Sequence, residues 1–149
     1  MGRIYEDIVV EGKKVKAKAD TGSDFPLALR MELIRELGLE KHPTIKASVI
    51  REENGKTIKD LEPTWTADIK IQKCRLTVPV VEAKGENLIG NTLLQRLKTD
   101  IDIENDKMTV RDCPTLPWSI DGKRRIFELM GDFVMTGYCG GKTGEIVNI

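Results

Sequence analysis

Residues 15–23 read Val-Lys-Ala-Lys-Ala-Asp-Thr-Gly-Ser, an alternating apolar and basic run that ends in an Asp-Thr-Gly turn. The alternation predicts a β-strand with one buried face. Gly22 allows the backbone to turn sharply and to approach a neighbouring segment where a side chain would clash. The carboxylate of Asp20 is therefore expected in a constrained loop. The simpler interpretation is that Asp20 is an ordinary Asx-turn residue and that Thr21 caps the turn.

Short strands are expected on both sides of this turn. Residues 4–10 and 14–19 flank Glu11-Gly12 and predict a hairpin that delivers the Asp20 loop. A second hairpin is expected from residues 45–50 and 56–61, because Asn54-Gly55 between them accepts the positive φ angles of a tight turn. Further strands are predicted at 64–71, 75–81, 100–103 and 108–111.

Two short helices complete the predicted secondary structure. Residues 27–37 space apolar side chains at helical intervals, and Gly38 follows as a stop signal. Residues 87–97 combine an apolar strand end, a glycine turn and a short helix with inward-facing leucines. The fold class is therefore mainly β, with one or two short helices.

Composition limits the classes of function. The chain has 149 residues, enough for one domain, with 40% hydrophobic and 32% charged residues. Its 24 basic and 24 acidic residues give a formal net charge of zero, which disfavours nucleic acid or an anionic membrane as a partner. No apolar run approaches the roughly 20 residues of a membrane span, and residues 1–6 lack a signal-peptide pattern. We expect a cytoplasmic protein.

Cysteine and histidine usage argues against metal and histidine-dependent chemistry. Cys74, Cys113 and Cys139 are widely spaced and odd in number, so we expect ordinary thiols. His42 is the only histidine and precedes a proline, in what we interpret as a solvated loop. We therefore predict no metal site and no cofactor, and neither Cys-His nor Ser-His-Asp catalysis.

The order of these elements resembles a known family. An Asp-Thr-Gly loop after a hairpin, a second hairpin, two strands, and the segment Leu-Ile-Gly-Asn-Thr-Leu-Leu at 88–94 are similar to the retropepsins. These are the single-domain aspartic proteases typified by retroviral proteases and their cellular relatives. The resemblance spans residues 4–111 and implies a closed β-barrel of the acid protease type that acts as a homodimer. It divides the chain into a protease domain, 1–111, and a C-terminal extension, 112–149.

The resemblance also implies roles for individual residues. Asp20 would be the catalytic carboxylate, Thr21 would hydrogen-bond across the dimer interface, and Gly22 would receive the substrate backbone. A flap at residues 49–58 would close over a bound peptide. The segment Leu88-Ile89-Gly90 would pack beside the catalytic loop, and Ala17, Ala19, Leu88 and Ile89 would form dry walls around the carboxylates. The positions expected to contact substrate are Ser23, Asp24, Val49, Ile50, Asn54, Gly55, Leu88 and Ile89.

The chain contains only one Asp-Thr-Gly. Aspartic protease chemistry needs two carboxylates that share a proton. Asp100 and Asp102 lack the following Thr-Gly, and their alternation places them on the outer face of a strand. The second carboxylate is therefore predicted to be Asp20 of another copy in a two-fold homodimer.

Two features depart from the viral pattern. The flap tip, residues 51–56, is charged instead of apolar and glycine-rich. Asp24 matches an acidic position that pairs with an arginine in viral relatives, but Asn91 stands at the arginine's place. We expect that interface ion pair to be absent.

Residues 112–149 lie outside the resemblance, and their role stays open. Residues 144–149 could form a strand that interleaves with a second copy, a flexible tail, a partner-binding element or a regulatory cover over the cleft. Residues 138–143 resemble a phosphate loop, but Thr136 stands where the Walker spacing needs glycine.

The leading functional prediction is a homodimeric aspartic endopeptidase that cleaves peptide or protein substrates. The alternative is a non-catalytic protein-binding or dimerisation domain that keeps the same fold, suggested by the charged flap, Asn91 and the C-terminal extension. A nucleotide-linked role through Lys142 and Thr143 is a third and weaker hypothesis.

Overall fold

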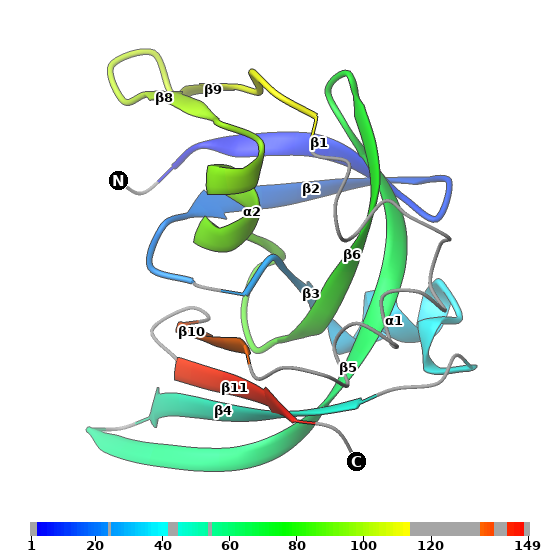
Figure 1. Cartoon of the computed structure of the whole chain (residues 1–149), viewed down its shortest axis with the longest axis vertical. Coiled ribbons are helices and arrows are strands. Elements are labelled where there is room, and N and C mark those ends of the chain that lie inside the picture. The colour runs from blue at the N-terminus through cyan, green and yellow to red at the C-terminus, as the bar shows by residue number, and fades with distance from the viewer. Residues whose placement is uncertain are drawn as a thin grey trace.

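The computed structural model describes residues 3–23, 25–41, 45–53, 55–113, 135–138 and 143–147 (Figure 1). The elements in chain order are β1 (Tyr5–Val10), β2 (Lys13–Asp20), β3 (Leu27–Arg30), α1 (Met31–Glu36), the 3-10 helix η1 (Leu39–Lys41), β4 (Ile45–Glu53), β5 (Lys56–Ile71), β6 (Cys74–Ala83), β7 (Leu88–Gly90), α2 (Asn91–Arg96), β8 (Asp100–Asp102), β9 (Lys107–Thr109), β10 (Met135–Tyr138) and β11 (Thr143–Val147).

Six strands close into a barrel. The main sheet has the order β1-β2-β7-β3-β6-β5-β4-β11-β10, and β1 also pairs with β5. Val9 opposite Lys70 and Val10 opposite Ile69 make this closing contact. The mainly β prediction is confirmed, and β4, β11 and β10 continue the sheet beyond the barrel.

The first hairpin forms as expected. Tyr5–Val10 pairs antiparallel with Lys13–Lys18, and the two turn residues Glu11 and Gly12 both have positive φ, 49° and 82°. Two positive φ angles match the right-handed twist of the flanking strands. This hairpin leads directly to Asp20 at the end of β2.

The second hairpin is longer than predicted. The predicted strands 56–61 and 64–71 are one continuous strand, β5, which runs through Pro63. Its first part pairs with β4 and its second part with β6, so β5 connects the barrel to the candidate flap. Gly55 at the turn has a φ of +76°, in agreement with the expected Asn-Gly turn.

The barrel encloses an apolar core built by strand alternation. Along β2 the side chains of Val15, Ala17 and Ala19 are buried, whereas Lys16 between the first two is exposed and Lys18 between the last two is partly exposed. Burial of such a strand face is the main favourable contribution to folding. Asp20 directly follows the buried Ala19 at the end of β2, so it lies at the edge of the core.

The predicted helix at 27–37 is wrong over its first four residues. Leu27–Arg30 forms strand β3, which pairs parallel with β6 and antiparallel with β7. Leu27, Ala28 and Leu29 are all fully buried, and a short continuous apolar run fits an interior strand as well as a helix. The helix itself begins at Met31, and Gly38 follows it with a φ of +70°.

Part of the C-terminal extension joins the sheet. β10 pairs antiparallel with β11, and β11 pairs antiparallel with β4. The phosphate-loop segment lies mostly outside the described residues.

The expectation of three ordinary thiols is wrong for two of them. Cys74 and Cys113 form a disulfide that links the start of β6 to the segment after β9. Sequence spacing alone does not reveal such a pair, because its members are 39 positions apart and only the fold brings them together.

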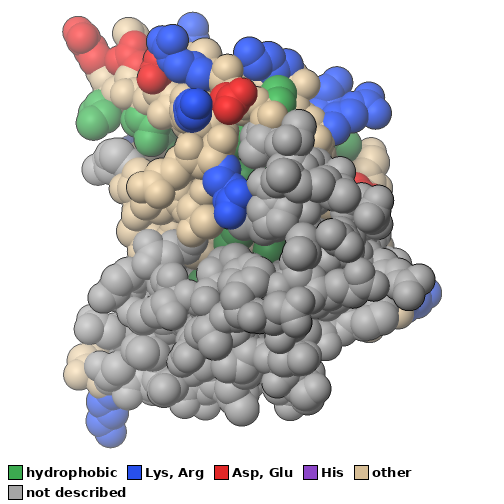
Figure 2. Space-filling model, viewed as in Figure 1, with side chains coloured by type: hydrophobic (Ala, Val, Ile, Leu, Met, Phe, Trp, Pro, Cys, Tyr) green, Lys and Arg blue, Asp and Glu red, His purple; other side chains and the backbone are tan. Residues whose placement is uncertain are grey.

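Charges of both signs share the visible face. Figure 2 shows Lys and Arg side chains mixed with Asp and Glu over the end of the molecule that carries β8 and β9. Across the described ranges, no helix combines the length and apolar character required to cross a membrane.

Candidate active site

The Asp20 loop is held by hydrogen bonds from its own backbone. The Gly22 N–H donates to Oδ1 of Asp20 at 2.9 Å, and the Ser23 N–H donates to the Asp20 carbonyl oxygen at 3.1 Å. This is an Asx-type turn, which fixes the direction of the carboxylate. The interpretation of Asp20 as an Asx-turn residue is therefore correct for its conformation. This conformation is also compatible with a catalytic role.

Gly22 matters because of its closeness to that carboxylate. A Cβ atom added at Gly22 would lie 3.2 Å from Oδ1 of Asp20. Contacts that short require the neighbour to move, so a side chain at this position would crowd the oxygen that the Gly22 N–H orients.

Strand β7 passes directly beneath the loop. Lys18, Ala19 and Asp20 pair in parallel with Leu88, Ile89 and Gly90, respectively. The Gly90 N–H donates to the Pro26 carbonyl at 3.0 Å, and the Asn91 N–H donates to the Ser23 carbonyl at 2.5 Å.

Gly90 tolerates no side chain at this crossing. An added Cβ would lie 1.5 Å from the carbonyl oxygen of Phe25 and 2.7 Å from that of Ser23. Both obstacles are backbone atoms of the Asp20 loop. The resemblance placed the segment Leu88-Ile89-Gly90 beside the catalytic loop, and the structure adds that the loop backbone leaves no room for a side chain at Gly90.

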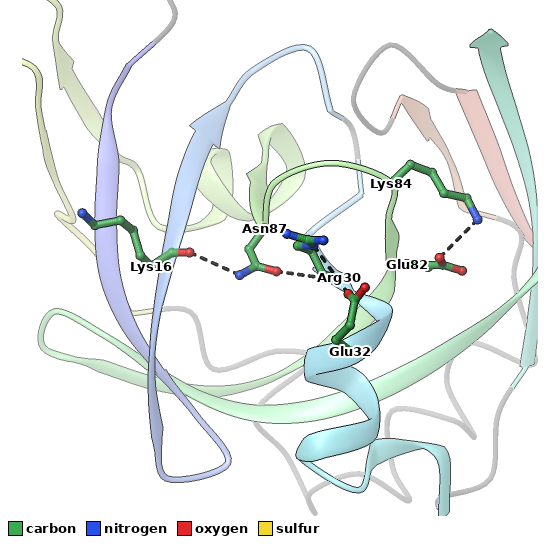
Figure 3. A network of polar contacts seen from close by, with 6 residues as sticks. All are labelled: Lys16, Arg30, Glu32, Glu82, Lys84 and Asn87. Atoms are coloured by element: carbon green, nitrogen blue, oxygen red, sulfur yellow. Dashed lines mark hydrogen bonds and ion pairs between the residues drawn. The ribbon is translucent and has the colours of Figure 1, made fainter.

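Asn87 connects the start of β7 to β2 and β3 (Figure 3). Its side-chain oxygen accepts from the Arg30 N–H at 2.9 Å, and its side-chain nitrogen donates to the Lys16 carbonyl at 3.3 Å. Its own carbonyl accepts from the Lys18 N–H at 2.8 Å. Sequence analysis did not single out Asn87, although an asparagine directly before a short strand is a recognisable signal of such local bonds.

Burial differs sharply along the loop. Thr21 and Gly22 are exposed, Asp20 is partly buried, and Ser23 is fully buried. Ser23 was expected to contact substrate, but its side chain is not exposed in this conformation. Ala17, Ala19 and Ile89 are also buried, as the expected dry wall requires, and Leu88 is partly buried.

The flap positions are defined by their backbone. Val49 lies opposite Asp60 and Ile50 opposite Lys59 on β5. Gly55 is exposed in the turn between the two strands. Asn54 and Asp24 lie outside the described residues, so the roles expected for them stay predictions.

Asp100 and Asp102, the other two carboxylates considered from the sequence, have partners of their own. Asp100 and Asp102 are exposed on β8, and Asp100 forms an ion pair with Arg111. The side chain and backbone N–H of Asn105 donate to Asp102, and these bonds hold the pKa of that carboxyl below its ordinary value. Neither lies on a turn like that of Asp20.

No cluster of metal-binding side chains accompanies the site. Among the described residues, no three His, Cys, Asp or Glu side chains lie close enough together to hold a metal ion.

Comparison with solved structures identifies the fold. The EIAV protease in complex with the inhibitor HBY-793 matches with a TM-score of 0.54 at 16% identity, covering 68% of this chain and 93% of that one. A retropepsin-like aspartic protease from Rickettsia conorii matches with a TM-score of 0.52 at 25% identity, covering 66% and 75%. The chain has the retropepsin fold.

A third structure with the same fold covers a larger share of the chain. The retroviral protease-like domain of Ddi1 from Leishmania major matches with a TM-score of 0.52 at 15% identity, covering 75% of this chain and 90% of that one. No protein-family model and no curated protein sequence matches the chain. The family resemblance drawn from the Asp-Thr-Gly and Leu-Ile-Gly segments is thus confirmed by the fold.

Proposed function

We propose that the chain is an aspartic endopeptidase whose catalytic pair consists of Asp20 from each of two copies. The observation that carries this proposal is the position of Asp20. Its carboxylate lies at the end of β2, is oriented by the Gly22 N–H, and rests on a loop that the Gly90 crossing supports.

Hydrolysis would proceed by activation of water. One Asp20 carboxylate, ionised, accepts a proton from a water molecule that attacks the scissile carbonyl carbon. The other, protonated, donates a hydrogen bond to the oxygen on which negative charge develops. No covalent intermediate with the enzyme and no cofactor are required.

The homodimer supplies the second carboxylate. The chain has a single Asp-Thr-Gly, and the carboxylates of β8 are exposed with partners of their own. The exposure of Thr21 and Gly22 leaves the loop accessible to an identical loop. A two-fold axis between the loops would bring equivalent carboxylates together.

The proposed substrate is an extended peptide segment. It would lie between the Asp20 loops and the flap hairpin formed by β4 and β5. The fold and the 25% identical Rickettsia conorii protease support this class of activity.

Replacement of the Asp20 carboxylate by an amide tests the proposal. Asp20→Asn should lower cleavage of a peptide library by at least about a hundredfold, because the amide neither accepts the proton of water nor shares one. The circular dichroism spectrum and Tm should stay near those of the parent. Asp102→Asn is the matched control, since it removes an exposed carboxylate from β8, and it should keep parental activity. Full activity of Asp20→Asn would exclude the mechanism and favour the non-catalytic alternative.

A further inference from the structure

The flap strand β4 has a pairing strand on both of its edges. From Lys46 to Ile50, each residue lies opposite one residue of β5 and one residue of β11. Val49 is opposite Gly144 and Ile50 is opposite Thr143 on the β11 side. These two flap positions are among those expected to contact substrate.

The hairpin of β10 and β11 lies on the side of the flap that faces the Asp20 loop. Figures 1 and 3 view the molecule differently, yet both show the same order: the loop after β2, then β10, β11 and β4. Residues 143–147 therefore fill the edge of β4 that is turned toward the candidate active site.

An exposed strand edge is a general binding site for extended polypeptide. Its unpaired N–H and C=O groups accept an added strand, and the main-chain bonds provide affinity with little dependence on sequence. A peptide held between the flap and the Asp20 loop must be extended. It would meet the same edge of β4 that β11 covers.

We propose that the edge of β4 from Lys46 to Ile50 is the strand-addition site for the extended substrate, and that the β10–β11 hairpin occupies it as an internal competitor. This inference rests on the proposed peptidase function and adds to it a binding edge and a means of regulation. The hairpin must leave β4 before a substrate strand can pair there.

The covalent connection makes this competition effective. The hairpin belongs to the same chain as β4, so it competes intramolecularly, at an effective concentration of up to about millimolar. A substrate at micromolar concentration would seldom displace it. Weakening the hairpin should therefore raise kcat/KM, and fixing it should lower kcat/KM.

A cross-strand disulfide tests where the hairpin lies without reference to activity. Glu145 is opposite Ser48 in the register of β11 and β4, so Ser48→Cys with Glu145→Cys places two thiols on directly facing positions. Lys46→Cys with Thr143→Cys is the mismatched control, because these residues are four positions out of register. Both pairs would be made in full-length protein carrying Cys139→Ser and oxidised with glutathione. Peptide mapping should find the cross-link in the matched pair only.

Activity measurements then test competition. The oxidised, matched pair should cleave a peptide library at least about tenfold more slowly than the same protein after reduction. Parent protein treated with the same reductant corrects for loss of the Cys74–Cys113 disulfide.

A backbone substitution should act in the opposite direction. Glu145 has a pairing residue on both sides, Thr136 of β10 and Ser48 of β4, so its N–H faces a pairing strand, and Glu145→Pro removes that N–H. This variant should raise kcat/KM by about tenfold or more. Glu145→Ala removes the same side chain but keeps the N–H, and it should match the parent.

The outcomes distinguish a failure of the proposed strand competition from a failure of the proposed peptidase function. A matched pair that does not cross-link overturns the inference, whatever the activity. Equal cleavage by locked, reduced, Glu145→Pro and parent proteins also overturns it and leaves the peptidase proposal intact. A complete lack of cleavage in all forms, including Glu145→Pro, contradicts the peptidase proposal itself.

Discussion

Gly90 is the most constrained residue of the candidate site. The Asp20 loop crosses it so closely that a Cβ atom would fall 1.5 Å from the Phe25 carbonyl oxygen. That obstacle is backbone, so only displacement of residues 23–26 would relieve it. The loop geometry of Asp20 therefore depends on the absence of a side chain on the neighbouring strand.

Gly90→Ala should destabilise the protein by more than about 4 kcal/mol or prevent folding, because the loop and β7 cannot both keep their positions. Gly85→Ala is the matched control. A Cβ at Gly85 meets nothing within 4 Å, so that variant should stay within about 1 kcal/mol of the parent. Urea unfolding monitored by circular dichroism measures both, and equal stability of the two variants would contradict the crossing geometry.

At the level of single residues, sequence predicted the Asp20 turn correctly for a local reason. Asp, Thr and Gly specify a tight turn by their own backbone preferences, and the hydrogen bond from Gly22 to Asp20 spans only two positions. The packing of Gly90 against this loop was expected only from the family resemblance, and local preferences do not predict it. It depends on Phe25 and Ser23, which are distant in sequence and meet Gly90 only in the folded barrel.

Among the elements, β2, β3 and β7 form the frame of the loop. Asn87 bonds to backbone groups of Lys16 and Arg30 through its side chain, and to Lys18 through its carbonyl. These contacts hold the start of β7 against β2 and the end of β3, on the strands that lead to Asp20 and Gly90.

Asn87→Ala should lower the free energy of unfolding by about 0.5–1.5 kcal/mol, since it removes the side-chain partner of the Arg30 N–H and the Lys16 carbonyl, and both bonds are exposed to water. Asn87→Asp keeps the acceptor for the Arg30 N–H but loses the donor, so its loss should be smaller. Denaturant titration of the two variants provides the comparison. A larger loss in Asn87→Asp than in Asn87→Ala would contradict this ranking.

Alternation of apolar and polar residues identified β1, β2, β8 and β9 because the apolar face of each strand is buried or partly buried and the polar face is more exposed. It failed for β3, where Leu27, Ala28 and Leu29 are buried together inside the sheet. A strand without a solvent face has no period of two to detect. The helical spacing of the same leucines was therefore misleading.

For the whole molecule, the disulfide and the C-terminal strands are long-range features that no local pattern predicts. Cys74–Cys113 and the pairing of β11 with β4 both join segments far apart in sequence. Disulfides are rare in most cytosolic proteins, so this one counts against the cytoplasmic location expected from sequence, which stays a prediction.

Removal of the disulfide should lower stability by about 2–4 kcal/mol, because an open chain gains more conformational freedom on unfolding. Cys113→Ser measures this loss in chemical denaturation. Adding reductant to Cys113→Ser should cause no further change, while reductant added to the parent should reproduce the loss. An unchanged parent under full reduction would show that the link contributes nothing.

The central claim is that the catalytic pair forms between two copies. It is tested most directly by titrating a fixed amount of parent protein with Asp20→Asn at concentrations where dimers predominate. If each active site needs two intact copies, an equal amount of Asp20→Asn should lower the total cleavage rate to about half, because mixed dimers withdraw parent chains from active ones. A rate that stays constant as Asp20→Asn is added would show that each chain acts alone and would contradict the account.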